Sequence, residues 1–218
     1  MSTWRNISGS LKQVSVGSAE DVWGTNAGDE IWRYLGDNKW QQIEGNLKQV
    51  SVAADGTVWG VNANEKIWRY LGENAWEQIE GSLKQVSVGS AKSIWGVNAN
   101  GEIWRYLGEN EWQQIEGHLK QVSVAADGTV WGVNANDKIW RYLGENEWQQ
   151  IVEGSLKQVS VGAAKDIWGV NANDETWMYL GENEWQQIEE HLKQVSVAAD
   201  GTVWGVNAND EIWRFLGD

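Results

Sequence analysis

Short segments of alternating hydrophobic and polar residues, separated by turn signals, recur along the whole chain. In one unit, residues 47–80, the segment LKQVSV places Val50 and Val52 on the same face, and Asp55-Gly56 then signals a two-residue hairpin. Asn62 and Asn64 mark the next turn because Asn tolerates the left-handed region. No stretch has the period of a helix. Four strands are predicted per unit: 47–52, 57–62, 67–71 and 76–79.

The unit repeats six times, with spacings of 36, 36, 36, 37 and 36 residues. All 18 tryptophans belong to three series of six, which we number by the predicted strand that carries them. The second-strand series is Trp23, Trp59, Trp95, Trp131, Trp168 and Trp204; the third-strand series is Trp32, Trp68, Trp104, Trp140, Trp177 and Trp213; the fourth-strand series is Trp4, Trp40, Trp76, Trp112, Trp148 and Trp185. A fixed period of this length is typical of repeat architectures.

Six units of four strands predict an all-β, six-bladed β-propeller with antiparallel blades, which forms a single domain over residues 1–218. The sixth unit stops after its third strand, and residues 2–8 match the missing fourth strand. We therefore expect the N-terminal strand to complete the last blade and close the ring. An open solenoid would instead carry modified capping repeats.

A longer rhythm runs through the loop after the first strand. Units two, four and six carry AADGT, whereas units one, three and five carry GSAED, GSAKS and GAAKD. The sixfold ring should therefore have approximate threefold symmetry. We also expect two of the three tryptophan series to be buried between blades, where they would provide much of the hydrophobic stabilisation.

The net charge of -14 argues against nucleic acid as a partner and against an anionic membrane surface. No Cys is present, so no disulfide or thiolate metal site can form. No apolar run is long enough to insert into a membrane, and the start of the sequence lacks the apolar core of a signal peptide. These features predict a cytoplasmic protein, with export by a non-classical route as the alternative.

Little in the sequence supports catalysis. The two histidines, His118 and His191, each precede a Leu-Lys pair, and we interpret both as exposed turn residues. The carboxylates of GENEW and NANDE repeat around the rim, whereas acid–base catalysis needs two carboxylates in different environments. Asp55-Gly56 lacks the ligand spacing of a calcium loop. We expect no enzyme, no metal and no cofactor.

Binding has more support, because the same polar and aromatic groups recur at one turn of each unit. Asn offers a donor and an acceptor, Arg a planar fork of donors, and Trp a flat apolar face, a combination that suits sugar rings. A purely structural role for these residues is the alternative. The candidate carbohydrate-binding residues are Asn26, Trp32, Arg33, Asn62, Asn64, Trp68, Arg69, Asn98, Asn100, Trp104, Arg105, Asn134, Asn136, Trp140, Arg141, Asn171, Asn173, Trp177, Asn207, Asn209, Trp213 and Arg214.

Some units depart from the pattern. Met178 replaces the Arg of unit five, and Phe215 replaces the Tyr of unit six. If the Arg contacts a ligand, the fifth site is weakened, and the number of functional sites is five or six. Arg69 shares a face with Ile67 and Leu71, so we expect its guanidinium to need partners in a cleft between blades.

The repeat W-x-x-I-x-G-x-L-K-Q-V-S-V, followed by W-G-V-N and I-W-R-Y, resembles the tectonin repeat over the whole chain, and fungal tectonin lectins with six blades most of all. This resemblance implies a β-propeller lectin that recognises surface glycans of foreign cells in innate defence, with one site in or beside each blade. The implied ligands are O-methylated sugars or bacterial lipopolysaccharide. The acidic charge favours a neutral sugar.

We therefore expect a multivalent carbohydrate-binding lectin with up to six similar sites for O-methylated or other neutral glycans of bacteria or nematodes. The alternative is a protein-interaction scaffold, since propellers and tectonin repeats also serve as adaptors. We expect a monomer, with an oligomer left open.

Overall fold

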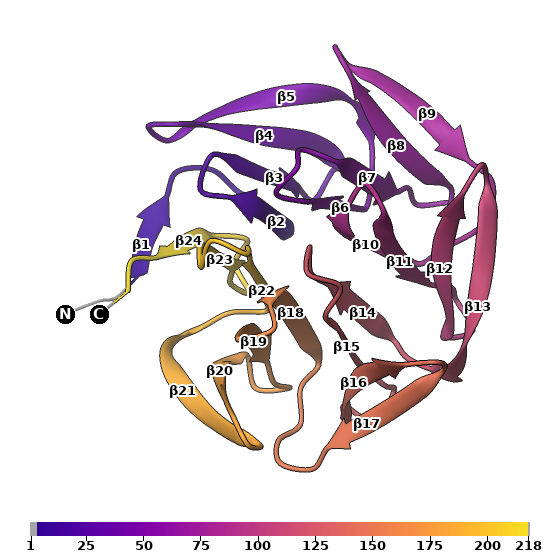
Figure 1. The fold of residues 1–218 in the computed structure, drawn as a ribbon. Helices are drawn as coiled ribbons and strands as arrows, with labels where there is room; N and C mark the ends of the chain where they lie inside the picture. The colour runs from indigo at the N-terminus through magenta and orange to yellow at the C-terminus, as the bar shows by residue number, and fades with distance from the viewer. Residues whose placement is uncertain (1–3, 218) are drawn as a thin grey trace.

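Six four-stranded antiparallel sheets form a ring in the computed structural model, which describes residues 4–217 (Figure 1). The strand order within each sheet follows the sequence, except that β1 lies beside β24. The predicted all-β, six-bladed propeller is confirmed. Among the described residues no helix is long and apolar enough to cross a membrane.

The strands of each blade are given in order from the axis to the rim. Blade 1 consists of β2 (Gln13–Ser18), β3 (Asp21–Thr25), β4 (Glu30–Gly36) and β5 (Lys39–Asn46). Blade 2 consists of β6 (Gln49–Val52), β7 (Val58–Val61), β8 (Ile67–Gly72) and β9 (Ala75–Ile79). Blade 3 consists of β10 (Gln85–Ser90), β11 (Ser93–Val97), β12 (Glu102–Gly108) and β13 (Glu111–His118).

The second half of the ring repeats this arrangement. Blade 4 consists of β14 (Gln121–Val124), β15 (Val130–Val133), β16 (Ile139–Gly144) and β17 (Glu147–Ile151). Blade 5 consists of β18 (Gln158–Ala163), β19 (Asp166–Val170), β20 (Glu175–Gly181) and β21 (Glu184–His191). Blade 6 consists of β22 (Gln194–Val197), β23 (Val203–Val206), β24 (Ile212–Phe215) and β1 (Trp4–Ile7).

The ring closes where the two ends of the chain meet. Strand β1 pairs with β24 in antiparallel register, with Trp4 opposite Phe215 and Ile7 opposite Ile212. Residues 2 and 3 of the predicted closing segment, like residues 1 and 218, lie outside the described part of the chain. Figure 1 shows β1 and β24 side by side. The N-terminal strand thus completes the last blade, as predicted.

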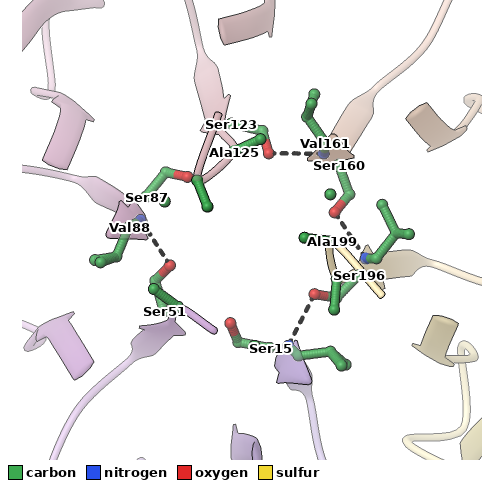
Figure 2. A pocket seen from close by; sticks show the side chains of 18 of the residues that line it. Ser15, Ser51, Ser87, Val88, Ser123, Ala125, Ser160, Val161, Ser196 and Ala199 are labelled. Atoms are coloured by element: carbon green, nitrogen blue, oxygen red, sulfur yellow. Dashed lines mark hydrogen bonds between the residues drawn. The ribbon is translucent and has the colours of Figure 1, made fainter. Parts of the chain in front are cut away.

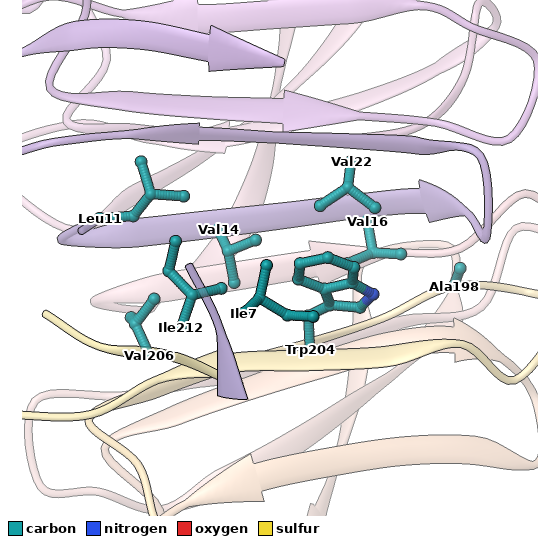
Figure 3. Close-up of a cluster of buried hydrophobic side chains, with 9 residues drawn as sticks. All are labelled: Ile7, Leu11, Val14, Val16, Val22, Ala198, Trp204, Val206 and Ile212. Atoms are coloured by element: carbon teal, nitrogen blue, oxygen red, sulfur yellow. The ribbon is translucent and has the colours of Figure 1, made fainter. Parts of the chain in front are cut away.

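The hydrophobic core lies between the blades, divided into six clusters. The cluster between blades 6 and 1 combines Val14 and Val16 of the innermost strand of blade 1 with Trp204 and Ile212 of blade 6 (Figure 3). Burial of apolar side chains from both blades at every junction opposes separation of the blades. In this arrangement only the second-strand Trp series is completely buried, at 0–3% exposure. The expectation that two Trp series are buried is therefore wrong: the third-strand series is partly exposed, and so is the fourth-strand series except for Trp4.

Polar side chains connect the innermost strands around the axis. Gln13 Oε1 accepts a hydrogen bond from Val50 N at 3.0 Å, and Gln13 Nε2 donates to Val50 O at 2.9 Å. Ser15 Oγ accepts from Val52 N at 3.0 Å. The same bonds recur at all six junctions, so the Gln and Ser of the KQVSV segment satisfy backbone groups of the next blade.

The loop after the first strand alternates between odd and even blades for a steric reason and a polar reason. A Cβ on Gly17 would lie 2.4 Å from Ala53 O, so an odd blade needs Gly where the next even blade comes close. At the other three junctions, an Asp of the even blade reaches the following odd blade. Asp55 Oδ2, for example, accepts a hydrogen bond from Ala91 N at 2.8 Å. Adjacent junctions therefore alternate near the axis.

Two turn predictions are corrected. Of Asp55 and Gly56, only Gly56 has a positive φ (80°), and its N–H donates to Ala53 O, so the segment is a four-residue turn and not a two-residue hairpin. The left-handed pair is instead Glu73 and Asn74, at φ 50° and 62°, between the third and fourth strands. Neither Asn62 nor Asn64 has a positive φ; Glu65 does, at 61°.

Candidate functional site

Clefts open between neighbouring blades where tryptophans of one blade face the end of the preceding blade. On β4, Trp32 and Tyr34 share a face because side chains alternate along a strand. Trp40 of β5 is the register partner of Tyr34, so it points the same way. All three pack against the cluster between blades 6 and 1. We name each cleft by its two blades, so this one is cleft 6/1.

Cleft 1/2 shows how the site is built. Trp68 and Trp76 of blade 2 form its walls, and Ile31 and Leu47 provide apolar floor. Asn62 places an amide at one end. Gly45 and Asn46, from the connection between the blades, complete the lining of a cavity of about 320 Å³.

Three other clefts contain cavities with the equivalent lining. Cleft 4/5 holds about 450 Å³, cleft 6/1 about 160 Å³ and cleft 2/3 about 150 Å³. Each has a third-strand Trp, a fourth-strand Trp, the first Asn of the turn, and a Gly-Ser-Leu segment. These residues are Trp177, Trp185, Asn171 and 154–156 in cleft 4/5; Trp32, Trp40, Asn26 and 9–11 in cleft 6/1; Trp104, Trp112, Asn98 and 81–83 in cleft 2/3.

The two wall tryptophans of a cleft differ in their polar atoms. The fourth-strand indole is fixed: Trp76 Nε1 donates to Glu44 O at 2.8 Å, and the equivalent bonds hold Trp40, Trp112, Trp148 and Trp185. Within residues 4–217 no third-strand Trp Nε1 donates a hydrogen bond, and that of Trp213 is buried without a partner. A cleft thus presents one rigid ring face and one indole N–H that a ligand oxygen can accept from.

The first Asn of each turn holds the loop at the cleft. Asn62 Oδ1 accepts from Asn64 N and Lys66 N, both at 3.0 Å, and its equivalents Asn26, Asn98, Asn134, Asn171 and Asn207 make the same pair of bonds. A structural role is therefore established for these side chains. The Nδ2 group donates to a glutamate in four units, those of Asn26, Asn98, Asn171 and Asn207.

Other candidates lie outside the cavities just described. The second Asn of the turn is exposed in every unit that carries it, namely Asn64, Asn100, Asn136, Asn173 and Asn209. The arginines Arg33, Arg69, Arg105, Arg141 and Arg214 alternate with the third-strand Trp, so they occupy the opposite face of the blade. The structure therefore brings the first Asn and the Trp together but separates them from the Arg of the same unit.

The arginines are half-exposed or exposed, and Arg33, Arg69 and Arg141 have local partners. Arg69 Nη2 lies 2.5 Å from Glu77 Oε2, with the Arg69 side chain 42% exposed. Arg33 Nε is 3.4 Å from Asp21 Oδ1, and its guanidinium lies over the Trp23 ring, 5.7 Å from the centroid. Solvent and a carboxylate are thus partners of the Arg69 guanidinium, whereas its Nε is buried without a hydrogen-bond partner among the described residues. The expected binding cleft for Arg69 stays a prediction.

Sequence reasoning missed three kinds of cleft residue. The fourth-strand Trp and the Gly of the inter-blade connection are not among the candidate binding residues. The residue after that Gly varies, being Ser10, Asn46, Ser82, His118, Ser155 or His191, and it lines the cavity in the four clefts described above. Variation at one position of an otherwise regular repeat was the available signal. His118 and His191 are exposed at the ends of β13 and β21.

Cleft 5/6 differs from the others. Glu190 stands where the other five clefts have Gly, and it adopts a φ of 137°. Thr176 replaces the floor Ile and donates from Oγ1 to Glu190 O at 3.0 Å. Met178 packs against the same cluster. Trp4, the fourth-strand Trp here, is only 4% exposed. The residues at this cleft, and the exposure of its fourth-strand Trp, therefore differ from those of the other five.

The axis of the ring offers a second, smaller cavity of about 60 Å³. Six serines line it, and Figure 2 shows their hydroxyls in a ring with the neighbouring Val N–H groups. Each Ser is 7–8% exposed and accepts one hydrogen bond from the next blade. Within residues 4–217 no group of three or more His, Cys, Asp or Glu side chains could hold a metal ion.

The clearest electrostatic feature also lies near the axis. Burial by itself raises the pKa of Asp55, but hydrogen bonds from Ala91 N and from the side chain and N–H of Thr57 outweigh it and lower the pKa below the usual value. Asp127 and Asp200 have lowered pKa values for the same balance of causes. These carboxylates are structural, since each hydrogen-bonds the next blade.

Comparison with known proteins identifies the repeat. The sequence model of the Tectonin domain matches residues 19–109 and 102–218. Among proteins with curated descriptions, none matches the chain in sequence.

Solved structures share the fold. A putative gluconolactonase has a TM-score of 0.72 at 12% identity, over 97% of this chain and 90% of that one. A catalytically inactive virginiamycin B lyase from Staphylococcus aureus, solved with quinupristin, has a TM-score of 0.64 at 18% identity, over 91% and 78%. YCF48 bound to D1 peptide has 0.64 at 14%, over 95% and 79%. At these identities the likeness establishes the architecture alone.

Proposed function

The chain belongs to the Tectonin domain family, and from that premise we propose that it is a multivalent lectin whose clefts between blades bind neutral sugars, O-methylated ones in particular. The observation that carries this proposal is the pair of partly buried tryptophans beside an amide and apolar side chains in four clefts. Sugars combine an apolar C–H face with hydroxyls, so they suit such a lining. Binding would be non-covalent, without metal or cofactor.

Cavity size limits the ligand. The volumes of 150 to 450 Å³ lie at or below the lower part of the range for drug-sized ligands, about 300–1,000 Å³, so a cleft suits a single sugar unit. An O-methyl group on that sugar would contact the Trp rings and the floor Ile or Leu without leaving a hydroxyl unsatisfied.

The number of sites follows from the cleft residues. Five clefts share the Gly and the partly exposed Trp pair, whereas cleft 5/6 carries Glu190 and a buried Trp4. We therefore expect five similar sites. If each binds at about millimolar affinity, simultaneous contact with an arrayed glycan would raise the apparent affinity about 10²- to 10⁴-fold.

The test is a titration followed through the tryptophan indole N–H signals by NMR, with methyl α-mannoside, methyl α-fucoside and their O-methylated forms. The third- and fourth-strand signals of five clefts should shift with saturation, while the second-strand signals, from buried rings, should not. Leu71→Ala provides a matched control outside the cleft. The proposal fails if no sugar shifts any indole signal, or if all three series shift alike.

The alternative, a protein-interaction scaffold, is favoured by one observation. Each blade exposes one leucine at the end of its third strand, 53–59% accessible: Leu35, Leu71, Leu107, Leu143, Leu180 and Leu216. A ring of apolar side chains is a feature that a protein partner recognises. Replacing these leucines with serine should abolish capture of a protein partner, whereas sugar binding should be unaffected.

A further inference from the structure

The clefts differ in charge at one position of the turn. In blades 1, 3, 5 and 6 the third strand is preceded by, or begins with, a glutamate: Glu30, Glu102, Glu175 and Glu211. In blades 2 and 4 a lysine takes its place, Lys66 and Lys138. This residue lies two positions before the third-strand Trp, and its N–H donates to Oδ1 of the first Asn of the turn, which lines the cavity in the clefts described above, so it stands next to the cleft.

The glutamate accepts a hydrogen bond from the side-chain amide of the first Asn. Glu102 Oε2 accepts from Asn98 Nδ2 at 2.5 Å, and the three equivalent pairs are 2.6 Å apart. These four clefts therefore present a carboxylate beside an amide that already donates one of its two N–H hydrogens to it. An anionic ligand would meet repulsion there.

In blades 2 and 4 the lysine replaces the carboxylate by a positive charge, and the backbone of the turn is unchanged. Lys66 N still donates to Asn62 Oδ1 at 3.0 Å, and Lys138 N to Asn134 Oδ1 at 3.0 Å. Across the described part of the chain, neither the Nδ2 of Asn62 nor that of Asn134 has a hydrogen-bond partner, and neither lysine has a carboxylate partner. Both lysines are exposed. A cation and an unused amide donor thus border clefts 1/2 and 3/4.

The neighbouring carboxylates do not neutralise these lysines. Glu65 accepts a hydrogen bond from Ser82 Oγ at 3.2 Å, which places it at cleft 2/3. Asp137 pairs with Lys120. The positive charge is therefore local, within a protein whose net charge is -14.

We propose that clefts 1/2 and 3/4 form a distinct pair of sites for sugars that carry a carboxylate, with Lys66 or Lys138 pairing with the carboxylate and Asn62 or Asn134 donating to it from Nδ2. Clefts 2/3, 4/5 and 6/1 take only uncharged sugars. This inference rests on the proposed lectin function and adds a second ligand class to it.

The experiment compares methyl glucuronide with methyl glucoside, and methyl mannuronide with methyl mannoside, by the indole NMR titration. The uronides should shift Trp68 and Trp140 at about fivefold lower concentration than the neutral sugars, the factor expected for two unit charges 4 Å apart in water. They should shift Trp32, Trp104 and Trp177 less than the neutral sugars do. Added 0.5 M NaCl should reduce the difference.

Charge-reversal variants make the test specific. Lys66→Glu with Lys138→Glu should remove the preference for uronides while leaving neutral-sugar shifts in place. Glu102→Lys should create the preference at Trp104. Uronides that shift all five clefts equally, or a preference that survives the double variant, would overturn the inference. Loss of response to neutral sugars as well would count against the lectin function itself.

Discussion

Clefts 1/2 and 5/6 are copies of the same repeat, and they have diverged in opposite directions. In cleft 1/2, Gly45 leaves space beside Trp76, and the cavity is open. In cleft 5/6, Glu190 takes the Gly position, and Trp4 is buried. Near the axis the two junctions are alike, since both set an odd-blade Gly against an even-blade Ala. The two junctions therefore differ only in the residues of their outer part. Packing around the axis is the same in both.

The comparison shows how a repeat protein separates stability from binding. A closed ring needs all six junctions, whereas a multivalent lectin tolerates the loss of one site. Cleft 5/6 is also the cleft where the strand from the opposite end of the chain, β1, supplies the fourth-strand Trp. Trp4 contacts both Trp168 and Phe215, with ring centroids 6.3 and 5.1 Å away, as Trp40 contacts Trp204 and Tyr34 at 6.3 and 5.0 Å in cleft 6/1. The ring closure therefore keeps the aromatic packing of the other junctions.

The largest effect is expected from removing the equivalent tryptophan in the two clefts. Trp4→Ala should cost about 4 kcal/mol of unfolding free energy, because it empties a buried site at the ring closure. Trp76→Ala should cost about 2 kcal/mol, because that ring is partly exposed, but it should abolish sugar binding in cleft 1/2. Urea denaturation measures the first quantity and the indole titration the second. Equal losses of stability would show that the two tryptophans are packed alike.

The next effect comes from placing the side chain of cleft 5/6 in cleft 1/2. Gly45 has a φ of 116°, and a Cβ there would lie 3.4 Å from Ile31 Cδ1 and Trp76 Nε1. Gly45→Glu should destabilise the protein by about 2 kcal/mol and remove the shift of Trp68 on sugar addition. Gly45→Ala is the control, since it introduces the same backbone strain without the carboxylate. If sugar still binds to the Glu variant, space at this position does not decide whether a cleft is functional.

The reverse change should have a smaller effect on stability. Glu190→Gly relieves a non-glycine residue at φ 137° but increases the freedom of the unfolded chain, so a net gain of about 1 kcal/mol is expected. The cleft should open, and the number of bound sugars measured by calorimetry should rise from five to six. His191→Ser, at the adjacent position, serves as the control. A count that stays at five would assign the closed state to Trp4 and Met178 instead.

The repeat allowed the fold to be predicted almost completely, because six copies average out local ambiguity. Alternation, turn residues and the offset of residues 2–8 gave the blades and the ring closure. Boundaries moved by one or two residues, as for β6, which begins at Gln49. The type of turn was harder, since Glu73 adopts a left-handed conformation that its residue type does not favour. A contact between blades holds this turn in place, because Asn74 Oδ1 accepts a hydrogen bond from Glu44 N of blade 1 at 3.2 Å.

The candidate site was predicted only in part. The first Asn and the third-strand Trp could be found because they recur. The fourth-strand Trp and the connecting Gly recur as well, but their role depends on which side of one blade meets which end of the next, and a sequence does not state that geometry. The arginines illustrate the same limit: period-two alternation already separates Arg69 from Trp68, and only the twist of the blade shows that Arg69 remains accessible to solvent.

The smallest expected effect concerns a feature that neither cleft contains. Asp55, Asp127 and Asp200 lie at the junctions between blades 2 and 3, 4 and 5, and 6 and 1. The pKa values of all three are lowered in the folded state. Because the pKa of an Asp in the unfolded chain is about 3.9, each carboxylate contributes stability that is fully present above that pH and is lost as the pH falls through the lower pKa of the folded state.

The triple variant Asp55→Asn, Asp127→Asn, Asp200→Asn should be less stable at pH 7 by about 0.5 kcal/mol per site and should lose less stability between pH 5 and pH 3 than the parent. Sugar titration of clefts 1/2 and 5/6 should be identical in parent and variant, since Asp55 Oδ2 contacts Ala91 of blade 3 and not either cleft. Unfolding curves at stepped pH provide the measurement, and a parent and variant with the same acid dependence would mean that other carboxylates set the acid stability of the ring.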